Sequence, residues 1–142
     1  MFVLDTDVLS LYLRGDRRLL LRLRAMPTAQ PTTTIVTVQE MLQGRLAQVR
    51  RARTGHDRVS AYAWLQRTVE VLSGLLILPF DDAAEAEFSA LSAGHLRLGS
   101  QDGKIAAIAL SRRAILVSRN LQHFQSIPAL RVQDWTVDEP LA

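Results

Sequence analysis

Hydrophobic residues occur along the chain in short, compact runs that alternate with longer segments of helical spacing. The compact runs are rich in Val, Ile, Leu and Thr and are bounded by polar residues, which is typical of buried strands. Strands are therefore predicted at 2–4, 32–36, 75–78 and 114–117, with a last short strand around 130–132.

Between these runs, apolar residues recur at three- and four-residue intervals, which predicts amphipathic helices. One such pattern covers 41–49, and a second follows a break at 54–55 and ends at Gly74. Asp16 and Ser100 are suitable helix caps. Further helices are accordingly predicted at 16–26, at 82–96 and from Ser100 through Ala109.

Strands and helices alternate throughout, which predicts an α/β fold with a mostly parallel sheet. The length of 142 residues fits a single domain over 1–142. In such sheets, ligands bind beyond the carboxyl ends of the strands. Candidate chemistry is therefore sought directly after each predicted strand.

Composition narrows the class of protein. Hydrophobic residues make up 48% of the chain and mean hydropathy is +0.07, yet no apolar run is long enough to span a bilayer. Asp5 and Asp7 stand where a secretory signal would be basic and then apolar. There is no cysteine, which excludes disulfides and thiolate metal sites. A cytoplasmic protein without membrane contact is expected.

The formal net charge is only +3, but sixteen of the seventeen basic residues are arginine and Lys104 is the single lysine. Arginine binds phosphate and carboxylate groups at two points, so this bias suggests a polyanionic or acidic partner. The coding bias of a GC-rich genome explains the same composition equally well.

Oxygen-bearing side chains follow the predicted strands. Asp5 ends the first strand, Glu40 and Asp102 fall in the first turns of predicted helices, and Asn120 follows the fourth strand. All four side chains can project into one cleft. Carboxylate oxygens are the ligands that Mg²⁺ and Mn²⁺ prefer.

Each of these residues also has a purely structural interpretation. Thr37 and Glu40 have the spacing of a helix capping box, acids such as Asp102 and Asp7 are favoured in a first helical turn, and Asn120 suits a turn. Asp5 is harder to explain, because a carboxylate beside a buried strand needs a compensating partner. Three clustered anions require either protons or a cation.

Polar neighbours of these residues suggest phosphate binding. Ser118 and Arg119 offer a hydroxyl and a guanidinium fork beside Asn120, whereas Lys104 and Arg112 lie on the Asp102 helix and can equally face solvent. The three histidines are not spaced like zinc ligands and are expected at the surface. They are His56, His95 and His123.

Two families resemble the opening FVLDTDVLS. In haloacid dehalogenase-like phosphatases, an apolar strand precedes a D-x-D motif, with Asp5 then corresponding to the nucleophile and Asp7 to the acid/base. That family places its serine or threonine strand before its last acidic pair, whereas here Asp81 and Asp82 precede Ser118. The order of motifs argues against this alternative.

The sequence resembles the PIN domain, in particular the VapC-type toxins, over residues 2–135. The similar segments occur in the family's order: VLDTDVLS, TIVTVQEMLQGR, ILPFDDAAEAEF, GSQDGKIAAIAL and LVSRNLQHFQSIPALRVQDW. The resemblance implies a three-layer α/β/α fold with a central, mostly parallel sheet of four to five strands.

The resemblance also implies an endoribonuclease whose metal ligands, for Mg²⁺ or Mn²⁺, are Asp5, Glu40 and Asp102. With Asn120, these form the expected catalytic set, and the products carry a 5′-phosphate and a 3′-hydroxyl. The residues expected to position the RNA or the attacking water are Thr6, Asp7, Ser118 and Arg119.

Expected partners are a VapB-like antitoxin, operator DNA reached only through the antitoxin complex, and a second copy in a homodimer. Two residues depart from the family pattern: Asp7 stands where Asn is usual, and His123 where an acid usually precedes Phe124. Asp7 could tighten metal binding or repel RNA. A weakly active domain that binds RNA or a partner is therefore kept as an alternative.

Overall fold

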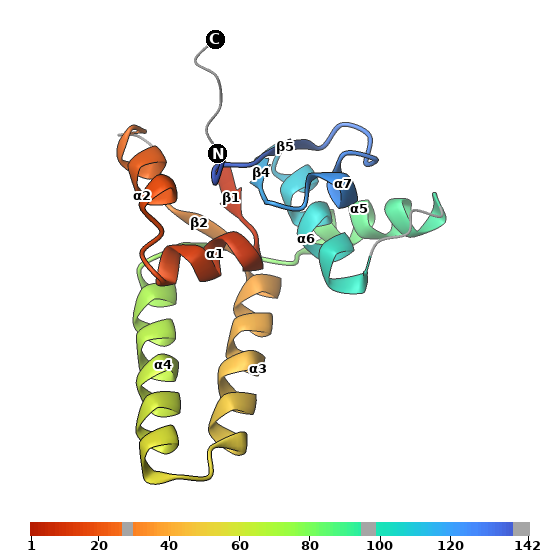
Figure 1. Ribbon diagram of the computed structural model, residues 1–142. Helices are drawn as coiled ribbons and strands as arrows, with labels where there is room; N and C mark the ends of the chain where they lie inside the picture. Colours follow the sequence, from red (N-terminus) through yellow and green to blue (C-terminus); the bar gives the residue numbers. More distant parts are fainter. Residues whose placement is uncertain (27–29, 95–98, 138–142) are drawn as a thin grey trace.

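The computed structural model describes residues 1–26, 30–94 and 99–137, which form a five-stranded parallel sheet between layers of helices (Figure 1). The strand order is β3-β2-β1-β4-β5. The strands are β1 (Phe2–Leu4), β2 (Thr32–Thr34), β3 (Leu76–Leu78), β4 (Ile115–Val117) and β5 (Arg131–Gln133). The predicted α/β class, parallel sheet and three-layer architecture are confirmed.

The described helices connect these strands. They are α1 (Thr6–Leu13), α2 (Arg17–Arg24), α3 (Ile35–Arg51), α4 (Gly55–Ser73), α5 (Asp82–Ala93), α6 (Ser100–Ser111) and the short α7 (Leu121–Phe124). The predicted break at 54–55 is confirmed, because Thr54 caps α4 and its side chain accepts a hydrogen bond from the Asp57 amide. Gly74 ends that helix as predicted.

The chain order places β1 at the centre of the sheet. Val3 pairs with Thr32 of β2 on one side and with Leu116 of β4 on the other. The chain runs outward through β2 and β3 and then returns to the opposite side of β1. The strand order therefore reverses between β1 and β4, and this is where parallel α/β sheets place their ligand crevice.

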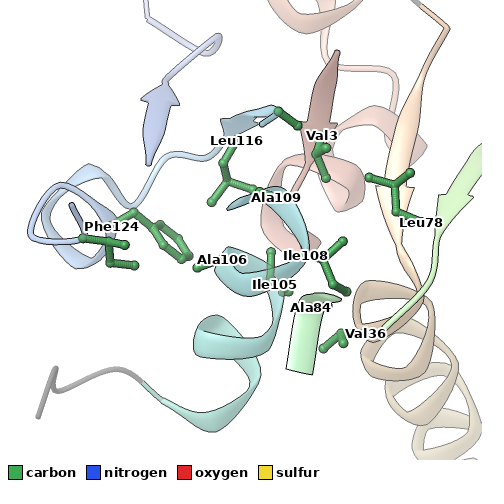
Figure 2. Close-up of a cluster of buried hydrophobic side chains, with 12 residues drawn as sticks. Val3, Val36, Leu78, Ala84, Ile105, Ala106, Ile108, Ala109, Leu116 and Phe124 are labelled. Carbon is green, nitrogen blue, oxygen red and sulfur yellow. The ribbon is translucent and has the colours of Figure 1, made fainter. Parts of the chain in front are cut away.

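Alternation along β1 separates the core into two parts. Val3 belongs to the cluster under α5 and α6, which Figure 2 shows with Ile105, Ile108 and Leu116. Leu4 points to the other face and packs with residues of α1 and α2 and with Trp135. Both faces of the sheet are thus covered, as parallel sheets require.

Small residues bring α6 close to the sheet. Ala106, Ala107 and Ala109 are completely buried, so the helix axis can approach the strands without large side chains between them. Because α6 precedes β4 and runs back against it, its first turn lies at the carboxyl edge of the sheet. α3 follows β2 and begins at the same edge. The fold therefore brings Asp102 and Glu40 to one edge.

The hairpin formed by α3 and α4 extends away from the sheet (Figure 1). Arg45 joins its helices: its Nε donates to Thr68 Oγ1 at 3.0 Å, and its guanidinium lies 4.8 Å from the Trp64 ring centroid. Among the residues that the structure describes, no helix combines the length and apolarity needed to cross a membrane.

Several predicted boundaries were wrong. Ile35 and Val36 begin α3 instead of ending β2, because Thr34 accepts a hydrogen bond from the Thr37 amide and starts the helix there. α1 was not predicted. Ser100 is the first residue of α6 and not its cap, a place taken by Gly99 without a side-chain bond. α5 ends at Ala93; its predicted end at 96 lies outside the described residues.

Candidate active site

A cleft of about 440 Å³ lies at the carboxyl edge of the sheet, where the strand order reverses. It brings together most of the predicted site residues from four separate segments of the chain. Its lining residues are Asp5, Thr6, Asp7, Glu40, Asp102, Ile105, Arg119, Asn120 and Phe124.

Asp5 is the most buried carboxylate of the cleft, with 7% of its surface exposed. It caps α1 by accepting a hydrogen bond from the Val8 amide at 2.9 Å, and its own amide donates to Val117 of β4 at 3.1 Å. Burial raises the pKa of Asp5 from 3.8 to about 6; hydrogen bonds from Ser118 and Val8 oppose this shift, and the charges of Asp7 and Asp102 add to it.

Glu40 is held from a different element. The capping-box interpretation is wrong, since the cap of α3 is Thr34 and Glu40 lies well inside the helix. The Thr6 hydroxyl donates to Glu40 Oε1 at 2.7 Å and lies 3.2 Å from the Thr37 hydroxyl. Thr6 therefore orients Glu40 toward the cleft and ties α1 to α3.

Asp102 meets a residue that sequence reasoning placed at the surface. His123 Nδ1 lies 3.5 Å from Asp102 Oδ2, and the Asn120 amide nitrogen lies 2.7 Å from the same ring nitrogen. The side chain of His123 is 58% exposed, which confirms its prediction as a surface residue. That prediction did not foresee its contacts with Asp102 and Asn120. The available signal was its place three residues after Asn120, one turn along the same short segment.

Asp7 is paired with Arg119. Arg119 Nε lies 2.6 Å from Asp7 Oδ2 and Nη2 lies 2.9 Å from Oδ1, a two-point ion pair between α1 and the segment after β4. This pair raises the pKa of Arg119 above its usual value. Asp5 and Asp7 are therefore not a matched pair of carboxylates, since one is buried and the other is held by an arginine.

Ser118 lies beneath the cleft and does not line it. Its side chain is completely buried. Its Oγ accepts a hydrogen bond from the backbone N–H of Asn120 at 2.9 Å. Its hydrogen bond to Asp5 lowers the pKa of that carboxyl, against the effect of burial. Its geometry suits a residue that orients Asp5 and Asn120.

The side chains of the cleft are chemically suited to bind a hard divalent cation, because Asp5, Glu40 and Asp102 present carboxylate oxygens to it. Burial is the main reason that the pKa of Asp5 is raised, and the charges of Asp7 and Asp102 add to the shift; a cation bound beside these acids would therefore stabilise the ionised carboxylate. Over the described ranges, no three acidic or imidazole side chains already stand together as a closed ligand group. Each carboxylate instead contacts a hydroxyl, a histidine or an arginine.

Lys104 and Arg112, weighed as phosphate-binding residues, lie outside the cleft. Lys104 is 3.5 Å from Gln101, and Arg112 pairs with Asp81 at 3.3 Å. A larger cavity of about 540 Å³ lies between α5 and the segments that flank β4 and β5, and its lining includes Arg113, Arg131 and Glu87. It has no cluster of acids, so the smaller cleft is the better candidate for chemistry.

In the comparison with protein families, the model described as the PIN domain aligns with residues 2–130. A comparison with curated proteins gives no match.

Solved structures share the fold over nearly the whole chain. VapBC-1 from nontypeable Haemophilus influenzae aligns with a TM-score of 0.76 at 20% identity, covering 96% of this chain and 98% of that one. VapBC2 from Rickettsia felis, bound to a promoter DNA fragment, gives 0.75 at 19% identity, with 94% and 98% covered. A toxin-antitoxin complex from Klebsiella pneumoniae gives 0.71 at 25% identity, with 95% and 98% covered.

Proposed function

The chain belongs to the PIN-domain family, and from that premise we propose that it is a metal-dependent endoribonuclease acting as the toxin of a VapBC-type toxin-antitoxin pair. The observation that carries this proposal is the meeting of Asp5, Glu40 and Asp102 in one cleft at the point where the strand order reverses. These acids come from three distant segments, and no single element of secondary structure requires them to meet.

Asp5, Glu40 and Asp102 would hold Mg²⁺ or Mn²⁺. When bound, such an ion lowers the pKa of a water molecule and neutralises charge that builds on the phosphate. The fold supports this role by holding the acids in place: Thr6 fixes Glu40, the Val8 amide fixes Asp5, and His123 contacts Asp102.

The proposed reaction is hydrolysis of a phosphodiester. A water oxygen forms the bond to phosphorus, and the bond from phosphorus to the 3′-oxygen breaks, leaving a 5′-phosphate and a 3′-hydroxyl. Asn120, whose amide lines the cleft, would position the phosphate or the water. Ser118 would act from below through Asp5 and Asn120. No covalent intermediate with the protein is needed.

The partner proposal follows from the structural relatives. They include VapBC complexes, one bound to a DNA fragment from its promoter and another, from Salmonella typhimurium, bound to DNA. We therefore propose a VapB-like antitoxin that inhibits this nuclease and carries it to operator DNA, together with a homodimer of this chain. Exposed apolar side chains on α2 and α4 supply contact area; Leu21 is 56% exposed, Tyr62 57% and Val69 51%.

Cleavage of RNA by the purified, antitoxin-free protein tests the proposal. Mg²⁺ or Mn²⁺ should support cleavage and EDTA should stop it. Asp102→Asn should remove activity while circular dichroism stays native, and Arg112→Ala, outside the cleft, should keep it. Cleavage by Asp102→Asn at the unaltered rate, or cleavage that persists in EDTA, would contradict the proposal.

A second candidate is a weakly active domain that binds RNA. The contact of His123 with Asp102 favours it, because a histidine there occupies an oxygen that a metal would use. RNA binding without cleavage at any concentration of divalent metal would select this candidate.

A further inference from the structure

Acidic side chains outnumber basic ones among the described residues that line the cleft. Of its described lining residues, Asp5, Asp7, Glu40 and Asp102 are acidic, and Arg119 is the only one with a permanent positive charge. A nucleic acid strand entering this cleft meets predominantly negative groups. Among the described side chains that line the cleft, Arg119 is therefore the one whose contact favours a phosphate, so the placement of this guanidinium matters more than its mere presence.

Asp7 determines that placement. It contacts the Nε and Nη2 edge of Arg119 through both of its carboxylate oxygens, at 2.6 and 2.9 Å. Nη1 is not part of this two-point contact. A guanidinium bound along one edge keeps donors on its other edge for a phosphate.

The pair is poorly suited to stabilising the fold. The side chains of Arg119 and Asp7 are 46% and 54% exposed, and ion pairs between exposed side chains contribute little to stability. Both oxygens of Asp7 are also engaged by Arg119, which argues against Asp7 as a further metal ligand. What the pair does fix is the direction of a long, flexible side chain at the cleft.

We propose that Asp7 is a positioning residue that holds Arg119 at the cleft, where the guanidinium contacts a phosphate of the bound RNA strand. This inference rests on the proposed function and adds a role for the acid at position 7. Asp7 then promotes RNA binding, although its own charge is negative, because it orders the only permanently cationic side chain among the described residues that line the cleft.

A double-mutant cycle on RNA affinity tests this role. Contacts to phosphate do not depend on base sequence, so the probe is a fluorescein-labelled single-stranded RNA of random sequence, measured by anisotropy. All variants carry Asp102→Asn so that the RNA stays intact. The cycle compares Asp7→Ala, Arg119→Ala and both together, with Arg119→Lys for the loss of the fork and Arg112→Ala as the matched control.

Arg119→Ala should weaken RNA binding about tenfold, as expected for one charge-assisted contact. Asp7→Ala should weaken it severalfold alone and not at all when Arg119 is already Ala. Arg119→Lys should recover only part of the loss, and Arg112→Ala, which breaks another half-exposed ion pair, should leave affinity unchanged. In the active protein, Asp7→Ala should raise KM for bulk bacterial RNA more than it lowers kcat.

Three results would overturn the inference. Tighter RNA binding by Asp7→Ala in both backgrounds would make Asp7 a repulsive group. Weaker Mn²⁺ binding by Asp7→Ala, compared with the unaltered protein in a background that keeps Asp102, would make Asp7 a metal ligand. Equal losses from Asp7→Ala with and without Arg119 would separate the two residues. Because binding is measured in an uncleaving background, absence of cleavage by the unaltered protein would contradict the proposed nuclease and leave this cycle readable.

Discussion

Thr6 donates its hydroxyl hydrogen to Glu40 across the space between α1 and α3, at 2.7 Å. The donor and the acceptor are far apart in sequence, and each lies on a helix that begins at the carboxyl edge of the sheet. Thr6 follows Asp5 directly, so one short segment supplies a buried acid and also the hydroxyl that orients a second acid. Because Thr6 adjoins one acid and orients another, substitutions at Thr6 test how the site is held together.

Thr6→Val should lower activity without unfolding the protein. The substitution keeps the shape and removes the donor to Glu40, and loss of a group that orients a metal ligand typically costs about 10- to 100-fold in metal affinity or activity. Mn²⁺ affinity by calorimetry and the rate of RNA cleavage check this. Thr6→Ser, which keeps the hydroxyl, should retain most of both; an equal loss in the Ser and Val variants would argue against the hydrogen bond.

Asp5→Asn should make the metal-free protein more stable at neutral pH while abolishing cleavage. The folded-state pKa of Asp5 is about 6 against 3.8 in the unfolded chain. An acid whose pKa rises on folding favours the folded state only when protonated, so its ionisation lowers stability as pH rises between those values. The full difference is roughly 3 kcal/mol above the higher pKa.

Asn cannot ionise and can still accept the hydrogen bond from Val8 that caps α1. Denaturant unfolding of both proteins across this pH range, in EDTA, measures the effect. The stability of the unaltered protein relative to Asp5→Asn should fall as pH rises from about 4 to about 6 and then level off. A constant difference across the range would show that Asp5 titrates normally.

Addition of Mn²⁺ should offset the loss of stability that ionisation of Asp5 causes in the metal-free protein. A cation that binds only the folded protein stabilises it by mass action, and ionised Asp5 binds a cation better than protonated Asp5. The rise in melting temperature on adding Mn²⁺ should therefore be larger above the pKa of Asp5, about 6, than below it. Asp102→Asn should reduce the rise at high pH, and Na⁺ at matched ionic strength controls for salt.

Patterning predicted β1, β3 and β4 well because they are compact apolar runs, and it found β2 from its β-branched threonines. It missed α1, since Asp5 was interpreted only as a site residue and its second role, capping the helix through Val8, leaves no separate signal in the sequence. It also extended β2 into Ile35 and Val36, because β-branched residues suit a strand unless a cap such as Thr34 starts a helix first.

Asp5 and Asp102 were predictable because Asp5 follows β1 and Asp102 lies in the first turn of α6 at the same edge; Glu40 was expected in a first helical turn but lies further inside α3. The partners of these acids were not predictable. Arg119 was predicted to lie near a phosphate, but its ion pair with Asp7 depends on the spacing of β1 and β4. His123 reaches Asp102 only because α7 and the first turn of α6 lie side by side, which no local pattern encodes.

The cap of α3 can be tested by stability alone. Thr34→Ala should lower the free energy of unfolding by about 1 kcal/mol, the usual cost of losing a capping oxygen, because the Thr37 amide loses its acceptor. Glu40→Gln, which keeps an acceptor for Thr6, should change stability by less than about 0.5 kcal/mol. The reverse order, with Glu40→Gln the more costly, would restore the capping-box interpretation. Denaturant melts of both variants in EDTA measure the difference.

His123→Asp should have opposite effects on metal binding and on stability. His123 lies 3.5 Å from Asp102, and a carboxylate at that position adds a fourth candidate ligand to the proposed set of Asp5, Glu40 and Asp102. More anionic oxygen ligands bind a divalent cation more tightly, so the Kd for Mn²⁺ should fall. In EDTA the same charge repels Asp102, so the melting temperature should drop.

His123→Asn serves as the matched control, because it removes the imidazole without adding charge and should leave Mn²⁺ affinity close to that of the unaltered protein. Calorimetric titration with Mn²⁺ and melting curves with and without the ion separate the two effects. If His123→Asp binds Mn²⁺ no more tightly than His123→Asn does, position 123 lies outside the electrostatic reach of the ion, and its contact with Asp102 concerns only the metal-free protein.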